Sequence, residues 1–198
     1  MSPSVLGLAK GFELYQSLVG APHSKRCFVE GYVRPLPGQR VLDLGCGTGA
    51  LLEYMPAGVE YVGVDIDERY IAAARKHYGD RATFACTDGT DYLPEGSFDI
   101  ALAYGVIHHL DDAHAQALLD VAAAAPRFVA AEPCRTAAAR KLERWIMSHD
   151  RGRFIRDEPA YRALAERSFA NVRIEPVAGT YRIPFTLAMI DCQARAAT

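Results

Sequence analysis

The sequence lacks a long apolar run, a basic cluster in its first ten residues and a strong net charge. No apolar stretch approaches the roughly 20 residues that cross a bilayer, and residues 1–10 lack the leading basic cluster of a secretory signal. The formal net charge is −2, which gives no global attraction to nucleic acid or to an anionic membrane. We therefore expect a cytoplasmic protein with neither a nucleic-acid partner nor a membrane partner.

Paired cysteines are also missing. The five cysteines are odd in number, widely spaced and without a CxxC pair, so a disulfide framework or a zinc cluster is not indicated. Reduced thiols in the cytoplasm are the simplest account. The cysteines are Cys27, Cys46, Cys86, Cys134 and Cys192.

The chain has no internal repeat, low-complexity stretch or interdomain linker. Its 198 residues, half of them apolar, suit one domain, residues 1–198, with a full hydrophobic core. Apolar spacing predicts helices over 4–34 (two), 68–78, 112–124, 136–148 and 157–168. In the last two helices we expect Leu142, Trp145 and Ile146, and Tyr161, Leu164 and Ala165, to point inward.

The remaining pattern is organised around residues 41–49. Residues 41–44 form a short, mainly aliphatic run typical of a buried strand. Glycine then recurs at every second position, at Gly45, Gly47 and Gly49, which permits positive φ angles and leaves no Cβ between backbone and ligand. Residues 50–54 resemble a helix start, so a ligand would lie over backbone N–H groups.

Asp43 helps to choose among the ligands of this loop. The spacing Gly45-x-Gly47-x-x-Ala50 also fits a nicotinamide-binding fingerprint. A carboxylate just before the glycines, however, suits the ammonium of a bound amino acid and would repel a pyrophosphate. A dinucleotide site and a plain strand-to-helix turn remain the alternatives.

With Asp43 included, residues 41–49 resemble the first motif of the class I S-adenosylmethionine (SAM)-dependent methyltransferases, close to hhDhGxGxG. The likeness extends over about residues 38–192. It implies an α/β fold: a single Rossmann-like, doubly wound sheet of seven strands, mostly parallel with an antiparallel last strand, and helices on both faces. Residues 1–35 would form an N-terminal helical lid over the SAM-binding core of residues 38–192. Monomer and homodimer are both open.

Two further acids follow predicted strands. Asp65, 20 residues after Gly45, can accept both hydroxyls of a ribose, although SAM and NAD both carry that ribose. In SAM enzymes an acid at the position of Asp88 receives the adenine amino group; an ordinary Asp-Gly turn is the competing interpretation. The residues expected to bind SAM, or its product S-adenosylhomocysteine, are Asp43, Gly45, Cys46, Gly47, Gly49, Asp65, Ile66, Asp88, Gly89, Tyr104 and Tyr15.

Two histidines follow the fourth predicted strand, in the stretch His-His-Leu-Asp-Asp of residues 108–112. Ligands of an open parallel sheet lie beyond the carboxyl ends of its strands, and histidine titrates near neutrality. We expect His109 to be the general base for the acceptor's proton, with His108 as the alternative and Glu132 orienting the imidazole. Either histidine, in contrast, can simply cap or support the turn.

We predict no metal site, because His108, His109, Asp111 and Asp112 cannot all converge from one short turn. A cluster of basic residues lies between residues 140 and 156. It either meets an acidic substrate or forms a solvated face paired with Glu143, Asp150, Asp157 and Glu158. The basic residues are Arg140, Lys141, Arg144, Arg151, Arg153 and Arg156.

The sequence therefore predicts an enzyme that moves a methyl group from SAM to an oxygen, nitrogen or carbon of a small molecule, such as a secondary metabolite, sugar or quinone. No Asn/Asp-Pro-Pro-Tyr/Phe follows the fourth strand, which disfavours methylation of DNA bases. A non-catalytic SAM-binding partner subunit and an NAD-dependent oxidoreductase are the alternatives.

Overall fold

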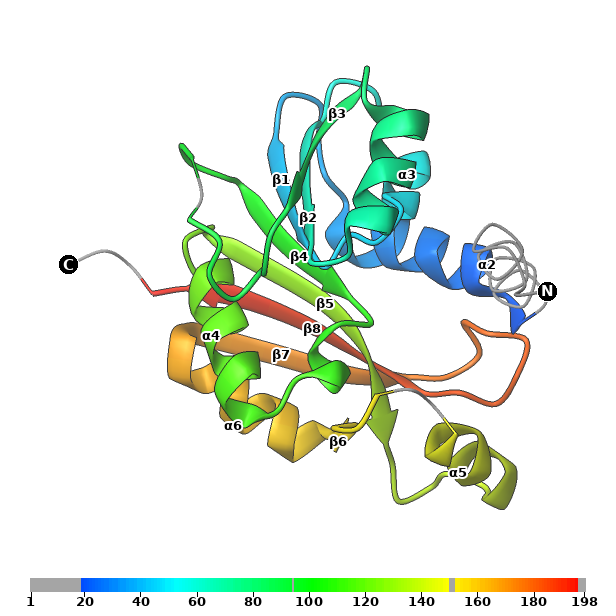
Figure 1. Cartoon of the computed structure of the whole chain (residues 1–198). Helices are drawn as coiled ribbons and strands as arrows, with labels where there is room; N and C mark the ends of the chain where they lie inside the picture. The colour runs from blue at the N-terminus through cyan, green and yellow to red at the C-terminus, as the bar shows by residue number, and fades with distance from the viewer. Residues whose placement is uncertain (1–18, 94, 150–151, 196–198) are drawn as a thin grey trace.

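The computed structural model describes residues 19–93, 95–149 and 152–195, and its centre is a twisted sheet in the order β3-β2-β1-β4-β5-β8-β7 (Figure 1). Strands β1 to β5 pair in parallel, whereas β8 is antiparallel to both β5 and β7. The predicted sheet of seven strands with an antiparallel last strand is thereby confirmed. The strands are β1 (Arg40–Leu44), β2 (Glu60–Asp65), β3 (Ala82–Cys86), β4 (Ile100–Tyr104), β5 (Arg127–Arg135), β7 (Phe169–Val177) and β8 (Leu187–Ala194). A short strand that the sequence did not predict, β6 (Arg156–Asp157), pairs with the end of β5.

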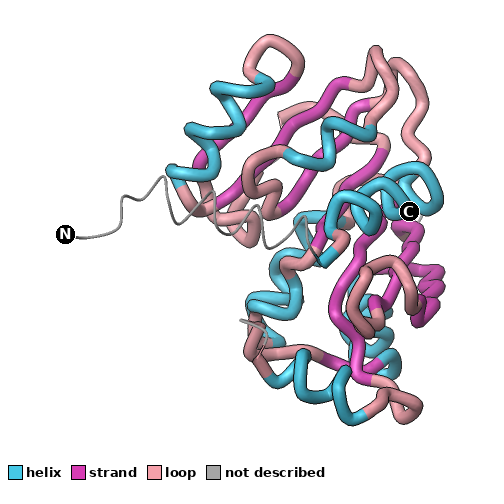
Figure 2. Tube along the Cα trace, turned by 90° about the vertical axis from the view of Figure 1, so that its right-hand side faces the viewer, coloured by secondary structure: helices cyan, strands magenta, loops and turns pink. Residues whose placement is uncertain are grey.

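Helices cover both faces of the sheet (Figure 2). One hydrophobic cluster joins the π-helix η1 (Cys27–Val33), the 3-10 helix η2 (Ala50–Tyr54) and α3 (Glu68–Tyr78) to one face. Helix α2 (Ala21–Arg26) packs against η1 and η2. The other cluster joins α4 (Asp112–Ala122) and α6 (Glu158–Ser168) to the opposite face. The 3-10 turn η3 (Ile107–His109) follows β4, and α5 (Lys141–Ser148) lies off the end of β5.

The central strand β4 shows why the sheet is buried on both sides. Ile100 and Leu102 belong to the first cluster, while Ala101 and Ala103 belong to the second, as the two-residue period of a strand requires. All four are at most 3% exposed. Without a polar face, this strand is stable only between two helical layers.

Aspartates begin three of the helices. Asp67, Asp111 and Asp157 accept hydrogen bonds from the backbone N–H groups of Arg69, His114 and Ala160, which caps α3, α4 and α6. The predicted helix over 68–78 is confirmed.

Two predicted helices differ from the structure. The segment after the glycine loop is a five-residue 3-10 helix that ends at Tyr54, since Pro56 and Gly58 follow at once, so it supplies no long helix dipole. The predicted helix over 136–148 is α5, and its buried residues are Glu143 and Met147. Leu142 and Trp145, expected to point inward, are 56% and 59% exposed.

The N-terminal prediction is tested only in part. Residues 1–18, and with them Tyr15, lie outside the described residues. From Ala21 onward the chain packs into the core: Phe28 and Val33 are fully buried. The Arg127 guanidinium donates to the carbonyls of Tyr32 and Val33 and pairs with Asp191, which fixes the end of η1 to the sheet.

Candidate functional site

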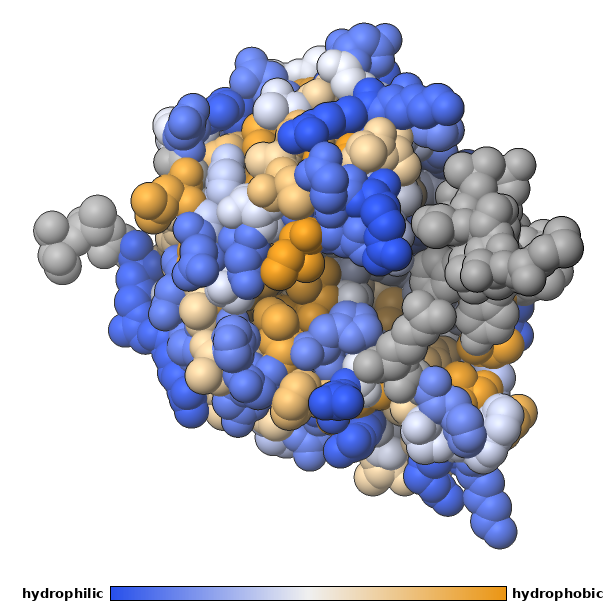
Figure 3. Space-filling model, viewed as in Figure 1, coloured by the Kyte–Doolittle hydropathy of each residue, from blue (hydrophilic) through white to orange (hydrophobic). Residues whose placement is uncertain are grey.

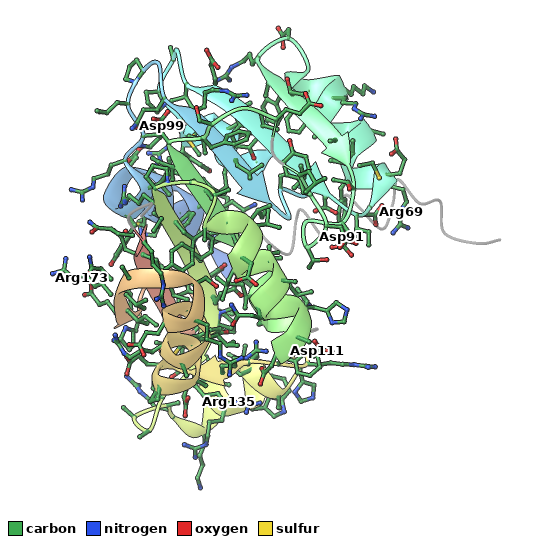
Figure 4. The ribbon with its side chains drawn as sticks, turned by 90° about the vertical axis from the view of Figure 1, so that its left-hand side faces the viewer. Arg69, Asp91, Asp99, Asp111, Arg135 and Arg173 are labelled. Carbon is green, nitrogen blue, oxygen red and sulfur yellow. The ribbon has the colours of Figure 1, made fainter. Side chains whose placement is uncertain are left out.

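The candidate site lies at the carboxyl edge of the parallel strands. Figure 4 shows Arg69, Asp91 and Asp111, which follow β2, β3 and β4, on one side of the molecule, and Asp99, which precedes β4, at the opposite edge. The sequence-predicted residues Asp65, Asp88 and Tyr104 end, or directly follow, these same strands. The topology thus brings together segments that are far apart in the chain.

The glycine loop after β1 is a tight, hydrogen-bonded turn. The N–H groups of Gly45 and Cys46 both donate to the carbonyl of Val64, and the Gly47 N–H donates to Asp65 Oδ2 at 2.8 Å. Gly45, Gly47 and Gly49 have φ angles of 77°, 55° and 75°, a region that side chains rarely adopt. A Cβ on Gly47 would meet no atom of the described part of the chain within 4 Å, so the described residues leave the space beside Gly47 open.

The other two glycines serve packing. A Cβ on Gly45 would lie 2.5 Å from Val106, and one on Gly49 would lie 3.0 Å from Phe84. Cys46 is buried and its Sγ lies against Gly63 of β2, where burial raises the pKa of the thiol far above its usual range. Any ligand contact of these three residues therefore involves the backbone.

Asp43 is a buried carboxylate with one unused oxygen. The side chain is 1% exposed. Oδ2 accepts a short hydrogen bond from the hydroxyl of Tyr61, and Oδ1 has no hydrogen-bond partner among the residues that the structure describes. Burial, followed by the charge of Asp65, raises the pKa of Asp43 to about 7, against the Tyr61 hydrogen bond and the charge of Lys25. Such an oxygen needs a donor, ideally a cationic one.

Asp65 joins the two loops that follow β1 and β2. Its Oδ2 accepts from Gly47 and its Oδ1 accepts from the Asp67 N–H at 2.9 Å. Each carboxylate oxygen keeps a second lone pair, so a diol can still bind. Ile66, beside it, is 71% exposed, and this large apolar side chain offers a surface for a flat ring.

Asp88 and Gly89 follow β3. Asp88 Oδ1 accepts from both the N–H and the hydroxyl of Thr90, which is the turn geometry that competed with the adenine interpretation. The turn occupies one carboxylate oxygen and leaves the other, so both roles are compatible. A Cβ on Gly89 would meet Leu118 and Leu44 at ordinary contact distance.

Tyr104, at the end of β4, links three segments. Its hydroxyl donates to Ser24 Oγ at 2.8 Å and lies 2.9 Å from the hydroxyl of Tyr181. Burial and the neighbouring Tyr181 raise the pKa of Tyr104 well above its usual value, so the phenol stays protonated. The residue thus fixes α2 and the loop before β8 beside the site.

Glu132 of β5 is fully buried and organises the turn after β4. It accepts hydrogen bonds from the N–H groups of Val106, Ile107 and His108, and its Oε2 lies 2.7 Å from His108 Nδ1. The prediction that Glu132 orients the ring of His109 differs from this geometry: the ring in contact with Glu132 is His108. Successive side chains of a tight turn point in different directions, and only one of them can face the sheet.

The two histidine rings form a small stack. His108 is 4% exposed, whereas His109 is exposed, and their ring centroids are 4.1 Å apart with a 38° tilt. The backbone of Gly152 lies against the His108 ring so closely that a Cβ there would collide with Cδ2. His109 is therefore the more accessible of the two rings.

Arg156 is a site residue that the sequence analysis placed only in a basic cluster. The side chain is 8% exposed, and it donates to the carbonyls of Ile107, Leu110 and Phe154 and to Asp112. The turn over residues 106–110 is thus held by Glu132 through its N–H groups and by Arg156 through its carbonyls. An arginine 44 residues beyond Asp112 gives no signal of this role in the sequence.

Other features lie apart from this edge. A groove of about 590 Å³ separates η1 from η2 and is lined by residues such as Arg26, Glu30 and Tyr54, and none of the predicted site residues lines it. Among the residues that the structure describes, no group of three or more His, Cys, Asp or Glu side chains is arranged to hold a metal ion. Within that same part of the chain, no helix is long and apolar enough to cross a membrane.

Known proteins share both sequence and fold with this chain. The family described as "Methyltransferase domain" matches residues 41–127. A ubiquinone biosynthesis O-methyltransferase of Bradyrhizobium diazoefficiens is 42% identical over 82 residues, which span 39% of this chain and 32% of that relative. The matched stretch thus covers about a third of the relative's length.

Solved structures show a likeness of fold over most of the chain. Magnesium protoporphyrin IX methyltransferase (ChlM) from Synechocystis PCC 6803, with bound SAH, superimposes with a TM-score of 0.68 at 22% identity, covering 88% of this chain and 84% of that one. The [4+2]-cyclase SpnF gives a TM-score of 0.70 at 16% identity, covering 89% and 82%. Residues 41–127 therefore match a methyltransferase domain, and the chain as a whole shares its fold with these solved structures.

Proposed function

We propose that the protein binds SAM at the carboxyl edge of β1–β4 and transfers its methyl group to a small-molecule acceptor. Two observations carry this proposal: among the described residues, the buried Oδ1 of Asp43 has no hydrogen-bond partner, and no atom fills the space beside Gly47. An unpaired buried oxygen is costly unless a ligand donates to it. The amino-acid ammonium of SAM is such a donor.

The remaining residues fit the rest of the cofactor. The free lone pairs of Asp65 suit the two ribose hydroxyls. Ile66 offers an apolar face to the adenine, and the second oxygen of Asp88, with the Gly89 backbone, suits the adenine edge. When bound, SAM supplies an activated methyl group, so the protein needs chiefly to align the acceptor and accept its proton.

For the acceptor we propose a small molecule with a hydroxyl group, in line with the name of the ubiquinone biosynthesis O-methyltransferase relatives. Its proton would pass to His109, the exposed ring of the pair. Glu132 and His108 then act beneath it: Glu132 holds the turn through three N–H groups and through the His108 ring. His109 thus remains the proposed base, and Glu132 supports it indirectly, through the turn and the His108 ring.

Binding separates the leading function from a nicotinamide enzyme. Calorimetry with SAM, S-adenosylhomocysteine and NAD should give heat with the first two and none with NAD. Saturable NAD binding without SAM binding would overturn the proposal. Conversion of SAM to S-adenosylhomocysteine with phenolic acceptors then distinguishes an enzyme from a non-catalytic SAM-binding subunit. Such a subunit would bind SAM and S-adenosylhomocysteine without turnover.

The base is tested by His109→Asn and His108→Asn, assayed separately with saturating SAM. We expect His109→Asn to lower kcat by roughly 10²–10⁴-fold with SAM affinity unchanged. His108→Asn should lower stability and kcat together, because it removes a buried partner of Glu132. A loss below tenfold in His109→Asn, with a larger loss in a folded His108→Asn, would transfer the role to His108. Small losses in both would indicate catalysis by proximity alone.

A further inference from the structure

Helix α5 carries an exposed face that the proposed methyl transfer does not use. Glu143 and Met147 are buried and Ile146 is partly buried against the first hydrophobic cluster, so the opposite side of the helix faces outward. The α5 face consists of five exposed residues: Arg140, Lys141, Leu142, Arg144 and Trp145. Figure 1 shows α5 at a corner of the molecule, away from the sheet.

The apolar part of the α5 face is a pair of large side chains on one helix. Leu142 and Trp145 stand three residues apart, on neighbouring positions of the helix surface, and are 56% and 59% exposed. Scattered exposed hydrophobic residues are ordinary, but a leucine and a tryptophan side by side on a projecting helix mark an interaction surface. Figure 3 shows strongly hydrophobic and strongly hydrophilic residues next to each other over α5.

The charged part of the α5 face is basic and is not neutralised locally. Arg135 and Arg153, also exposed, flank the helix in the sequence, and Figure 4 shows Arg135 pointing away from the body. Among the described residues of 135–155, the acid is Glu143, which is buried and accepts from the Thr186 hydroxyl. A surface with this excess of cations attracts an anionic partner.

The acids once expected to pair with this basic cluster have other partners. Asp157 caps α6 through the Ala160 N–H, and Glu158 pairs with Arg162; Asp150 lies outside the described residues. Arg156 is buried against Asp112 and does not belong to the surface. The basic residues of α5 therefore do not form the solvated face, paired with these acids, that was one of the two alternatives from the sequence.

We propose that the α5 face docks on an anionic lipid bilayer surface. Tryptophan prefers the boundary between headgroups and acyl chains, and lysine and arginine beside an apolar stripe are typical of helices that lie in that boundary. The face is convex and projects, which suits a broad surface, whereas a small anionic molecule needs a concave site. The interaction is peripheral and independent of methyl transfer.

The test uses Trp145, the single tryptophan of the chain, as a reporter. Full-length protein is mixed with vesicles of phosphatidylcholine, alone or with about a third phosphatidylglycerol, the anionic lipid to which cations respond. Trp145 emission should shift to the blue, and the protein should sediment with the anionic vesicles. Both effects should weaken as salt is raised. No shift and no sedimentation with anionic vesicles would overturn the proposal.

Variants separate the charge from the apolar anchor. Reversing two cations in R140E/K141E should weaken vesicle binding by at least about fivefold, given the contribution of each cation near an anionic surface. Leu142→Ser should weaken it while leaving the salt dependence. The matched control is Lys76→Glu, an exposed cation in the last turn of α3, which should bind as the original protein does.

Other occupants give different results. If a second copy of the chain covers α5, Trp145 emission will depend on protein concentration without lipid, and sedimentation analysis will show a dimer that Leu142→Ser disrupts. If the α5 face binds an acidic protein, vesicles will not compete for it. Equal vesicle binding by R140E/K141E and Lys76→Glu would also contradict the proposal. Since these variants lie away from the glycine loop, SAM affinity serves as their check for folding.

Discussion

Two buried carboxylates, both facing the carboxyl edge, differ sharply in what surrounds them. Glu132 at the end of β5 accepts from three backbone N–H groups and contacts the His108 ring. Among the described residues, Asp43 in β1 accepts from Tyr61, and its Oδ1 has no hydrogen-bond partner. A buried charge with several donors stabilises its surroundings, whereas one with an unused oxygen is held at a cost. The first therefore supports the fold, and we infer that the second is kept for a ligand.

The largest expected effect is on the ligand side of this comparison. Gly47→Val should abolish SAM binding, because its methyl groups would fill the open space at Gly47 and a β-branched residue is strained at a φ of 55°. Calorimetry measures the loss, and Gly47→Ala is the matched control with a smaller side chain. Full SAM affinity in a folded Gly47→Val protein would mean that the ligand does not cross this loop.

On the structural side, Glu132→Ala should lower the free energy of unfolding by about 3–5 kcal/mol, because three buried N–H groups and the His108 ring lose their acceptor. Urea unfolding measures it. Glu132→Gln, which keeps one acceptor oxygen, should lose less. If Glu132→Ala lost less than about 1 kcal/mol, Glu132 would not be the support of the turn, and the comparison with Asp43 would fail.

Asp65 serves both the ligand site and the fold. Asp65→Ala should weaken SAM binding by about 1.5–3 kcal/mol, typical of charge-assisted hydrogen bonds. It should also lower stability, because the Gly47 and Asp67 N–H groups lose an acceptor. Calorimetry and urea unfolding measure the two effects. Unchanged SAM affinity would remove Asp65 from the ribose site, and an unchanged unfolding curve would show that water replaces it in the loop.

The smallest effect distinguishes Asp43 by pH. Its pKa is about 7 in the folded protein, against 3.8 ordinarily. Folding therefore binds a proton between these values, and the stability that this proton supports is present at low pH and is lost as pH rises through about 7. Asp43→Asn should match the original protein below about pH 4 and become steadily more stable than it as pH rises to about 7, which urea unfolding at a series of pH values measures. Its SAM affinity should be lower at pH 5 and at pH 8.

The same pKa predicts how SAM binding depends on pH. An ammonium binds the ionised carboxylate, so affinity should rise as pH increases through about 7, and binding below that pH should release a proton. Calorimetry in buffers of different ionisation enthalpy counts the proton. Identical pH profiles for the original protein and Asp43→Asn would mean that Asp43 does not face the ammonium.

Local patterns were enough for several elements. The aliphatic run of residues 41–44, the glycine spacing after Leu44 and the apolar spacing over 68–78 and 112–124 are signals confined to short stretches, and the structure confirms the strand, the loop and the two helices that they predict. The prediction for α5 was wrong because it rested on local spacing alone: apolar spacing suggested that Leu142 and Trp145 form the inner side of the helix. The contact that decides the rotation of the helix, Glu143 with Thr186, joins residues 43 positions apart.

The sequence by itself determined the fold class, the loop that carries the glycines and the strand ends where the site forms, because periodicity, turn chemistry and one local motif specify them. Tertiary structure alone decided which ring Glu132 contacts, that Arg156 is buried against the same turn, that Asp43 retains an unused oxygen and that α5 turns its leucine and tryptophan outward. These features depend on which segments meet across the sheet. A buried polar group must then find its partner among whatever neighbours the packing supplies.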